Sequence, residues 1–311
     1  MKKETLFAVL TAASLMLTAC GPVKEQAAPQ EAQNFACVTD DNGRTVTFAA
    51  KPERIVVTSA SFLAPLYAVG GEVVGRPMTK SKVIAEAANA ATIGPVYQID
   101  AEKVLSLTPD LVIINKGMNE KLIETLAAND IKTLVVEMKS YDDVKREVGM
   151  FAALTGETEK GHALIEKMDA DIEEVRASIP QEKKRVSIIH STGQGLSVQL
   201  DGSIAGCIVK MLGWENTASG MTALDKNPDA APYSMETLVS QNPDIIFVTS
   251  MGEEAEIRAS MEQMFAESPA WQSVAAVREG RVYYLPQELF LFSPGIDYPA
   301  AVRYMARLIY P

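Results

Sequence analysis

The chain has 311 residues and carries 40 acidic against 29 basic side chains, which gives a net charge of −11. This acidic balance argues against a nucleic-acid partner, because phosphate groups require a basic protein face. The content of 47% hydrophobic and 22% charged residues is ordinary for a globular protein, and the length suggests two domains or one large domain.

The first twenty residues predict export and lipid attachment. A basic start is followed by an apolar stretch over residues 6–17, which is typical of a secretory signal peptide. A transmembrane helix is the alternative, but this stretch is too short to cross ~30 Å of hydrocarbon comfortably. The run Leu17-Thr18-Ala19-Cys20 resembles the lipobox of bacterial lipoproteins. The resemblance implies that residues 1–19 are removed and that Cys20 carries the lipid that anchors the protein outside the cytoplasm.

A tether and a hairpin are expected next. Residues 20–35 are rich in Gln, Ala, Pro and Glu with almost no large apolar side chain, which predicts a flexible tether. The turn sequence at residues 40–44, flanked by β-branched residues, predicts a hairpin over residues 38–48.

Strands and helices then alternate through a first lobe, residues 36–156. Strand-like runs begin at Arg54, Leu111 and Thr133, and helical patterns cover residues 62–69 and 120–128. This alternation predicts an α/β fold with a mostly parallel sheet that is covered on both faces.

The same plan restarts in a second lobe, residues 181–311. Strand-like runs begin at Arg185, Asp244 and Val282. Between the lobes, residues 157–180 show helical spacing of apolar side chains, and a helix of ~20 residues spans about 30 Å. We interpret it as a strut that joins the lobes; a surface helix within one large domain is the alternative.

One segment occurs in both halves. Glu102-Lys-Val-Leu-Ser-Leu-Thr-Pro-Asp110 aligns with Glu236-Thr-Leu-Val-Ser-Gln-Asn-Pro-Asp244 at a constant offset of 134 residues. Each copy leads into a β-branched strand, so the pattern indicates two related lobes rather than a short-period repeat.

Together these features resemble the substrate-binding proteins of ABC importers for iron complexes and cobalamin. The resemblance covers about residues 38–311 and rests on Lys51-Pro-Glu-Arg-Ile-Val-Val, on the segment around Glu102, and on Leu285-Pro-Gln-Glu-Leu-Phe followed by Ser293-Pro-Gly. It implies two doubly wound lobes joined by a single long helix, with the ligand in a cleft between them. It also implies a monomer without a resident cofactor that delivers its ligand to a permease dimer with a cytoplasmic ATPase. In that family one glutamate per lobe meets arginines of the permease, and Glu102 and Glu236 occupy those positions; a role at a helix N-terminus is the alternative.

The ligand is expected beyond the carboxyl ends of the strands. The candidates there are mostly aromatic or sulfur-containing and include few cations, which favours a flat, apolar ligand over an anionic catecholate siderophore. They are Ser61, Phe62, Tyr97, Met118, His190, Tyr233, Met251, Phe290 and Phe292.

Haem is the favoured ligand, and cobalamin or a ferric siderophore is the alternative. Two segments resemble the iron-ligand segments of haem-binding lipoproteins, which makes Tyr97 and Met251 candidate iron ligands. These residues stand where the subfamily has Met and His, so a stacking residue and a packing residue are the alternatives. His162 is expected on the strut and His190 at a strand end, so a bare-metal site is not expected.

Two further questions stay open at this level. Cys37 and Cys207 either pair or remain thiols. The sequence shows no Gly-x-Ser-x-Gly, His-Glu-x-x-His or phosphate-loop motif, so an enzyme is not expected; a lipid-anchored hydrolase is a remote alternative.

Overall fold

The structure is a computed structural model that describes residues 34–79 and 83–311. The predicted signal peptide, Cys20 and nearly all of the predicted tether lie outside the described residues. Within the described ranges, no helix has both the length and the apolar character needed to cross a membrane.

The first lobe opens with the expected hairpin, in which β1 (Ala36–Thr39) pairs antiparallel with β2 (Thr45–Phe48). The Asp40 carboxylate closes the turn, since it accepts hydrogen bonds from the backbone N–H groups of Asn42 at 3.1 Å and Arg44 at 2.9 Å. Such a local carboxylate bond is the usual reason for Asp in a tight turn.

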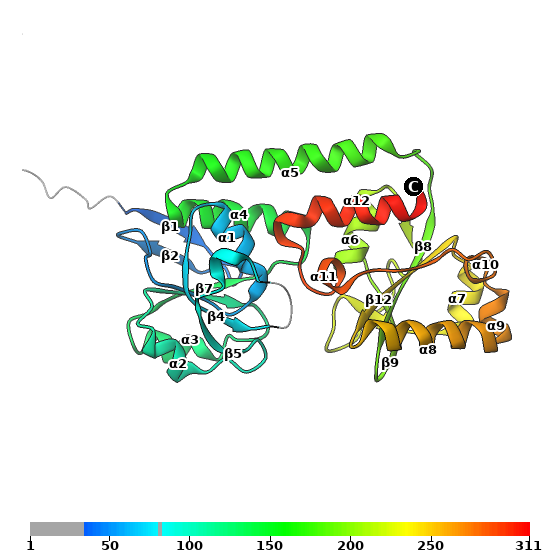
Figure 1. The fold of residues 1–311 in the computed structure, drawn as a ribbon, viewed down its shortest axis with the longest axis horizontal. Coiled ribbons are helices and arrows are strands. Elements are labelled where there is room, and N and C mark those ends of the chain that lie inside the picture. Colours follow the sequence, from blue (N-terminus) through cyan, green and yellow to red (C-terminus); the bar gives the residue numbers. More distant parts are fainter. Residues whose placement is uncertain (1–33, 80–82) are drawn as a thin grey trace, which may run out of the picture. The chain divides into compact units, whose positions relative to one another are not determined.

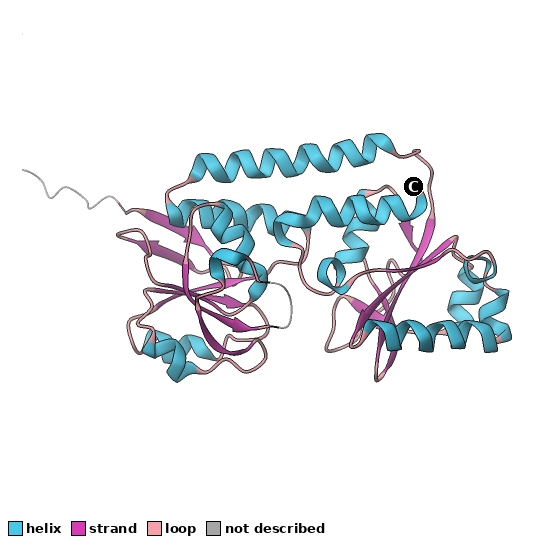
Figure 2. Cartoon of the chain, viewed as in Figure 1, coloured by secondary structure: helices cyan, strands magenta, loops and turns pink. Residues whose placement is uncertain are grey.

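A five-stranded parallel sheet follows (Figures 1 and 2). Its order is β5 (Ala91–Pro95), β4 (Val73–Met78), β3 (Ile55–Val57), β6 (Leu111–Asn115) and β7 (Lys132–Val136). Along β6, Leu111 and Ile113 join one buried cluster, and Val112 and Ile114 join another. Both faces of this sheet are therefore buried, as the continuous apolar runs predicted.

The helices of this lobe begin and end at recognisable signals. They are α1 (Leu63–Ala68), α2 (Ala101–Ser106), α3 (Leu122–Ala127) and α4 (Tyr141–Thr155), with short 3-10 turns η1 (Ala60–Phe62) and η2 (Ala85–Ala87). Ser140 and Asp143 form a capping box at the start of α4, and Gly156 ends it with a φ of 76°. That left-handed conformation is easy only for glycine.

The expected strut is α5 (Thr158–Ser178), which ends immediately before Ile179 and Pro180. The C-terminal helix α12 (Tyr298–Ile309) lies against it, and Arg303 Nη2 is 3.2 Å from Glu174 Oε2. Figure 1 shows the two helices running side by side. The sequence did not predict this second long helix beside the strut.

The second lobe contains a six-stranded mixed sheet. Its order is β11 (Ala230–Pro232), β9 (Gly195–Gln199), β8 (Arg185–Thr192), β12 (Ile245–Met251) and β13 (Val282–Tyr284), with β10 (Glu215–Asn216) paired to the start of β8. Strand β9 runs antiparallel to both neighbours, because Gly193 and Gln194 connect it to β8 as a tight hairpin. The lobe is thus doubly wound around β8, β12 and β13, with a hairpin added at one side.

The remaining helices cover this sheet and lead to the C-terminus. They are α6 (Ile204–Met211), α7 (Met235–Gln241), α8 (Glu254–Glu267), α9 (Pro269–Ser273), α10 (Ala275–Arg278) and α11 (Gln287–Phe290), followed by the 3-10 turn η3 (Gly295–Asp297).

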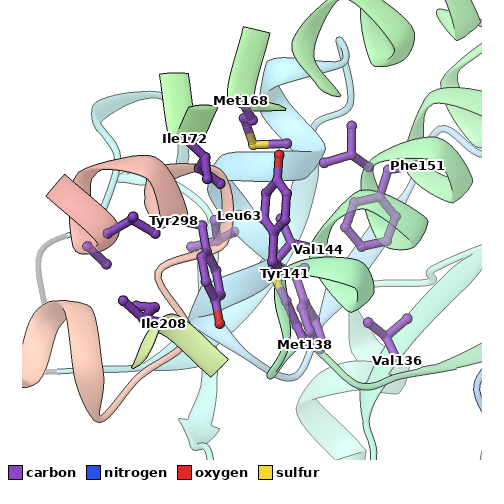
Figure 3. Close-up of a cluster of buried hydrophobic side chains, with 14 of the residues drawn as sticks. Leu63, Val136, Met138, Tyr141, Val144, Phe151, Met168, Ile172, Ile208 and Tyr298 are labelled. Atoms are coloured by element: carbon purple, nitrogen blue, oxygen red, sulfur yellow. The ribbon is translucent and has the colours of Figure 1, made fainter. Parts of the chain in front are cut away.

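One hydrophobic cluster continues from the first lobe through α5 into the second (Figure 3). It contains Leu63 and Tyr141 of the first lobe, Ile172 of α5 and Ile208 of the second lobe. Tyr298 of α12 is fully buried among them, and its ring centroid lies 5.4 Å from that of Tyr141. Residues 34–311 accordingly form a single compact unit, and the lobe boundaries at residues 156 and 181 stay a prediction.

Candidate ligand-binding site

Large exposed apolar side chains lie at the carboxyl ends of the strands in both sheets. Each one follows or ends a strand, or follows the helix after β13, and each is at least 47% exposed. They are Met78 (57%), Tyr97 (73%), Met118 (47%), Met251 (54%) and Phe292 (47%). Large exposed apolar groups can contact a ligand, and we take these five as the candidate ligand surface. Four of the five were predicted; Met78 was missed because β4 was not recognised as a strand.

A buried asparagine ties the loops of Tyr97 and Met118 together. Asn119 is 1% exposed, and its side-chain amide donates a hydrogen bond to the Val96 carbonyl at 3.0 Å. The Met118 loop is also fixed by the Glu120 carboxylate, which accepts from the Gly117 N–H at 2.8 Å. These bonds set the spacing between Tyr97 and Met118, and no sequence motif marked Asn119 for this task.

Gln287 plays the matching part in the second lobe. Its amide donates to the Gly252 carbonyl at 2.8 Å and to Ser250 Oγ at 3.2 Å, and its backbone N–H donates to Glu254 Oε1 at 2.8 Å. The turn that carries Met251 is thereby joined to the start of α11.

Two predicted ligand residues are core residues instead. Phe62 is 1% exposed and packs edge-on against Phe151 with ring centroids 6.4 Å apart, and Phe290 is 2% exposed near Tyr304. Each ring occupies the buried face of its helical turn, so the prediction that they line the ligand surface was wrong. Ser61 is half-buried beside Phe62, and its backbone N–H is 3.3 Å from the capping hydroxyl of Ser59.

Two other candidates are half-buried with partners of their own. His190 Nδ1 lies 3.0 Å from Thr249 Oγ1 on the neighbouring strand, and burial lowers the pKa of its imidazole. Tyr233 stacks on Trp271 at 5.9 Å, and burial raises the pKa of its phenol to about 12. Neither group is free to reach outward as Tyr97 and Met251 are.

The predicted docking glutamates occupy equivalent places. Glu102 and Glu236 are each the second residue of a short helix, α2 and α7, and both are exposed. The preceding side chains, Asp100 and Ser234, accept backbone hydrogen bonds and cap the helices. Strand β11 runs parallel to β8, so α7, which follows β11, starts at the carboxyl edge of its sheet, as α2 does in the first lobe. The exposed apolar side chains lie at the same edges.

An arginine clasps the far end of each of these helices. In the first lobe, Arg54 Nη2 donates to the Leu107 carbonyl at 2.6 Å, and the Asp110 carboxylate accepts from the Arg54 N–H at 3.0 Å. In the second, Arg185 Nη1 donates to the Gln241 carbonyl at 2.6 Å, and Asp244 accepts from the Arg185 N–H at 2.8 Å.

A residue just beyond the end of each helix also has the same unusual backbone. Thr108 has a φ of 45° and Asn242 a φ of 43°, and they are 134 residues apart. Left-handed backbone outside glycine is uncommon. Its recurrence confirms that the sequence repeat corresponds to a structural repeat.

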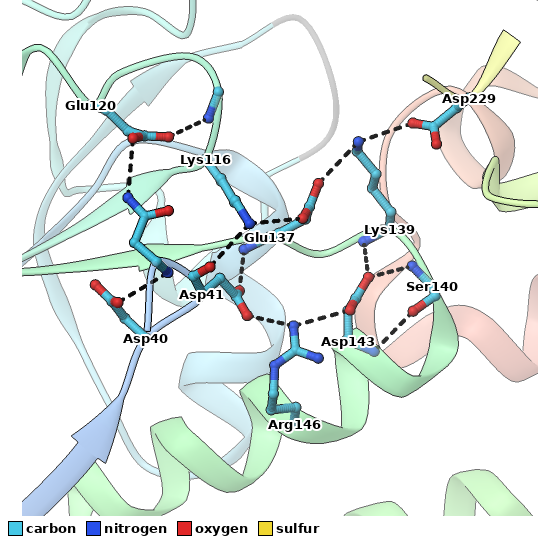
Figure 4. Close-up of polar contacts among 12 residues, drawn as sticks. Asp40, Asp41, Lys116, Glu120, Glu137, Lys139, Ser140, Asp143, Arg146 and Asp229 are labelled. Carbon is cyan, nitrogen blue, oxygen red and sulfur yellow. Dashed lines mark hydrogen bonds and ion pairs between the residues drawn. The ribbon is translucent and has the colours of Figure 1, made fainter. Parts of the chain in front are cut away.

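Two lysines near the first carboxyl edge are already paired (Figure 4). Lys116 Nζ lies 3.0 Å from the Asp41 carbonyl and 3.5 Å from Glu137, and Lys139 Nζ lies 3.0 Å from Glu137 and 2.9 Å from Asp229. Arg76 in β4 donates to the carbonyls of its own loop. The described residues therefore present no arginine cluster for a polyanionic ligand at this edge.

Other possible sites lie elsewhere or are absent from the described ranges. Recesses of about 310 and 660 Å³ open near Trp214 and near Tyr67, at the amino ends of the central strands, away from the exposed apolar groups. The described residues contain no group of three or more His, Cys, Asp or Glu side chains placed to hold a metal ion. Cys37 and Cys207 are free thiols.

Two α/β lobes, a long connecting helix and exposed apolar side chains at the carboxyl edges of both sheets define a two-lobed class of binding protein. The chain belongs to the periplasmic binding protein family, whose model matches residues 55–289. It is 24% identical to the Fe(3+)-citrate-binding protein YfmC of Bacillus subtilis over 95% of this chain and 93% of the relative. It is 27% identical to the iron(3+)-hydroxamate-binding protein FhuD of the same organism, over 94% and 92%. The fold matches the Staphylococcus aureus IsdE–heme crystal structure with a TM-score of 0.71 at 20% identity, covering 83% of this chain and 99% of that one.

Proposed function

We propose that this protein captures an iron complex or tetrapyrrole outside the cytoplasm and delivers it to an ABC-type permease. The observation that carries the proposal is the set of five exposed apolar side chains at the carboxyl edges of both sheets. Membership of the periplasmic binding protein family supports a transport role rather than an enzymatic one. The names of the relatives, which mention ferric citrate, iron hydroxamate and haem, support this ligand range and do not favour one member of it.

Among the described residues, the pairing of two lysines near the site favours an apolar ligand of low charge. Lys116 and Lys139 are held by Glu137, Asp229 and a backbone carbonyl, so neither is available without breaking a pair. To bind these lysines, a highly charged anion would have to break their existing ion pairs and lose its own hydration, and both steps cost free energy. A ferric hydroxamate, cobalamin, or haem with its propionates toward solvent avoids this cost.

The test is a titration of the full chain with haem, a ferric trihydroxamate, cobalamin and ferric citrate, followed by tryptophan fluorescence. At least one of the first three should bind below roughly 10 μM, where ~7 kcal/mol of binding free energy is available. Met118→Ala and Met251→Ala should each weaken binding, whereas Leu224→Ala, an exposed apolar residue elsewhere, should not. No binding of the first three would refute the ligand class.

Haem is the first ligand to test, with Tyr97 as the axial oxygen and Met251 as the alternative. Tyr97 is 73% exposed and makes no side-chain contact that fixes its phenol. Phenolate ligation favours ferric iron, and it should give a charge-transfer band that Tyr97→Phe removes. An unchanged spectrum in that variant would exclude Tyr97 as the ligand.

Glu102 and Glu236 are proposed to dock the protein onto arginines of the permease. Both are exposed at the start of a clasped helix, where bidentate pairing with Arg is geometrically open. The double change to Ala should abolish uptake of the bound complex and leave ligand affinity intact, with partial loss for either single change. Glu124→Ala and Glu256→Ala, exposed glutamates on α3 and α8, serve as matched controls. Loss of ligand affinity in the double variant would place these residues in the ligand site instead.

Anchoring through lipid on Cys20 is proposed from the sequence motif alone. Cys20→Ser should release the protein from membranes and abolish incorporation of labelled fatty acid. A membrane-bound, unlabelled wild type would contradict it.

A further inference from the structure

A single ion pair joins the two lobes within the described residues. Lys139 lies just after β7 in the first lobe, and Asp229 lies just before β11 in the second. Lys139 Nζ is 2.9 Å from Asp229 Oδ2 (Figure 4). We propose that this pair is an inter-lobe latch that sets the spacing of the two carboxyl edges.

Lys139 is firmly placed on the first-lobe side. Its backbone N–H donates to Asp143 Oδ2 at 3.2 Å, within the capping box that starts α4. The capping box fixes the main chain at Lys139, so a pull on its ammonium group acts on the first lobe and not only on a flexible side chain. Beside the ion pair, the Lys139 carbonyl accepts a hydrogen bond at 3.4 Å from the hydroxyl of Tyr298, which belongs to the second lobe.

Asp229 is equally well placed on the second-lobe side. Its carbonyl accepts from the Leu200 N–H at 2.9 Å, and its N–H donates to Asn227 Oδ1 at 3.1 Å. Gly202 leaves room for the carboxylate, since a Cβ there would lie 2.8 Å from Asp229 Oδ1. The second lobe is thus shaped to present this carboxylate.

The latch is continuous with a loop of the candidate ligand site. Glu137 Oε1 is 3.0 Å from Lys139 Nζ, and Glu137 Oε2 is 3.5 Å from Lys116 Nζ. Lys116 lies two residues before Met118. A chain of ion pairs, from Lys116 through Glu137 and Lys139 to Asp229, therefore connects the Met118 loop to the second lobe. A displacement of that loop is transmitted through this chain to the ion pair between the lobes.

The pair is favourable but exposed enough to be tunable. Burial alone would lower the pKa of Lys139, but the hydrogen bonds with Asp229 and Glu137 outweigh it and raise that pKa. The side chains of Lys139 and Asp229 are 44% and 26% exposed, so salt should screen their attraction. An inter-lobe contact of this kind can be altered without unfolding the continuous core.

The test measures the distance between the lobes and needs no ligand. Spin labels are attached at Glu124→Cys and Glu256→Cys in a full chain whose three native cysteines are changed to Ser, and the distance distribution is recorded by pulsed electron paramagnetic resonance. Asp229→Asn should broaden or shift the distribution, and Asp229→Glu, which keeps the charge, should restore it. High salt should change the wild type and leave Asp229→Asn unaltered.

Matched variants separate the latch from general loosening. Lys139→Gln should reproduce the effect of Asp229→Asn. Arg303→Gln, which breaks the pair between α12 and α5, should have no such effect. A distribution that is the same in wild type, Asp229→Asn and Lys139→Gln would overturn the proposal, and so would an equal response in Arg303→Gln.

Discussion

Because of one buried carboxyl group in the first lobe, the free energy of unfolding of this protein should fall steeply as the pH rises. Glu147 on α4 is fully buried, and neither of its oxygens has a hydrogen-bond acceptor or donor assigned to it among the described residues. Arg146 Nε lies 3.3 Å away but also faces Asp41 and Asp143. Burial, reinforced by the nearby Asp41 carboxylate, raises the pKa of Glu147 from 4.5 to about 9. The folded state therefore keeps Glu147 protonated.

The magnitude follows from the difference between the two states. Above pH 4.5 the unfolded chain ionises this glutamate, while the folded chain holds it protonated up to pH about 9. Each pH unit in that window lowers the free energy of unfolding by about 1.4 kcal/mol. The stabilisation is thus fully present below pH 4.5, declines across the window, and falls by about 4 kcal/mol between pH 5 and pH 8.

Glu147→Gln removes this dependence while keeping the shape of the side chain. We expect the variant to gain about 4 kcal/mol over wild type between pH 5 and pH 8, measured by urea unfolding with tryptophan fluorescence. Asp142→Asn, an exposed carboxylate on the same helix, is the matched control and should show a nearly constant difference. Parallel curves of unfolding free energy against pH for wild type and Glu147→Gln would refute a protonated, buried Glu147.

Three further results are expected. Thr108→Asn should stabilise the protein by ~0.5–1 kcal/mol in thermal unfolding, because Asn tolerates left-handed backbone better than Thr, and Asn242→Thr should cost a similar amount; opposite signs would contradict the backbone geometry. Gly161→Ala should destabilise the protein by ~1–3 kcal/mol, because the new Cβ would lie 2.5 Å from the Cβ of Ala152. Gly149→Ala has open space around it and should stabilise the protein by ~0.5–1 kcal/mol. Equal effects of the two changes would show that α4 and α5 are not so tightly packed. Because one hydrophobic cluster continues through both lobes, ligand binding should change the distance between spin labels on the two lobes only slightly, and a large closure would contradict that continuity.

The elements with strong local signals were predictable. The hairpin, the strands β3, β6, β7, β8, β12 and β13, and the helix α5 all appear where β-branched runs, turn residues and helical spacing placed them. Strand β4 was missed because Gly75 and Pro77 interrupt its apolar pattern; Gly75 is required there, since a Cβ would lie 2.5 Å from Leu107 Cδ1. Helix α12 was missed because the helices it packs against, α5 and α6, are distant in sequence, and strand β9 was missed although Gly193 and Gln194 join it directly to β8.

The site was predictable only in part, for a physical reason. Position after a strand identifies which side chains reach the carboxyl edge, and this located Tyr97, Met118, Met251 and Phe292. It does not tell which side of a helical turn faces the core, so Phe62 was misplaced. The residues that brace the loops are polar and isolated in the sequence, so only the structure reveals their long-range bonds.

The two clasps have a consequence for how such a protein diversifies. Each glutamate proposed to dock lies at the start of a helix whose far end is tied to the amino end of a strand, through Arg54 and Arg185. The side chains that would touch a ligand come from separate loops at the opposite end of the strands. Under the proposed docking, loop sequences can therefore change the cargo while the two carboxylates keep their position. One permease could in this way accept several binding proteins with different cargoes, and grafting the loops after β5, β6 and β12 is a route to new specificity without redesigning the transporter.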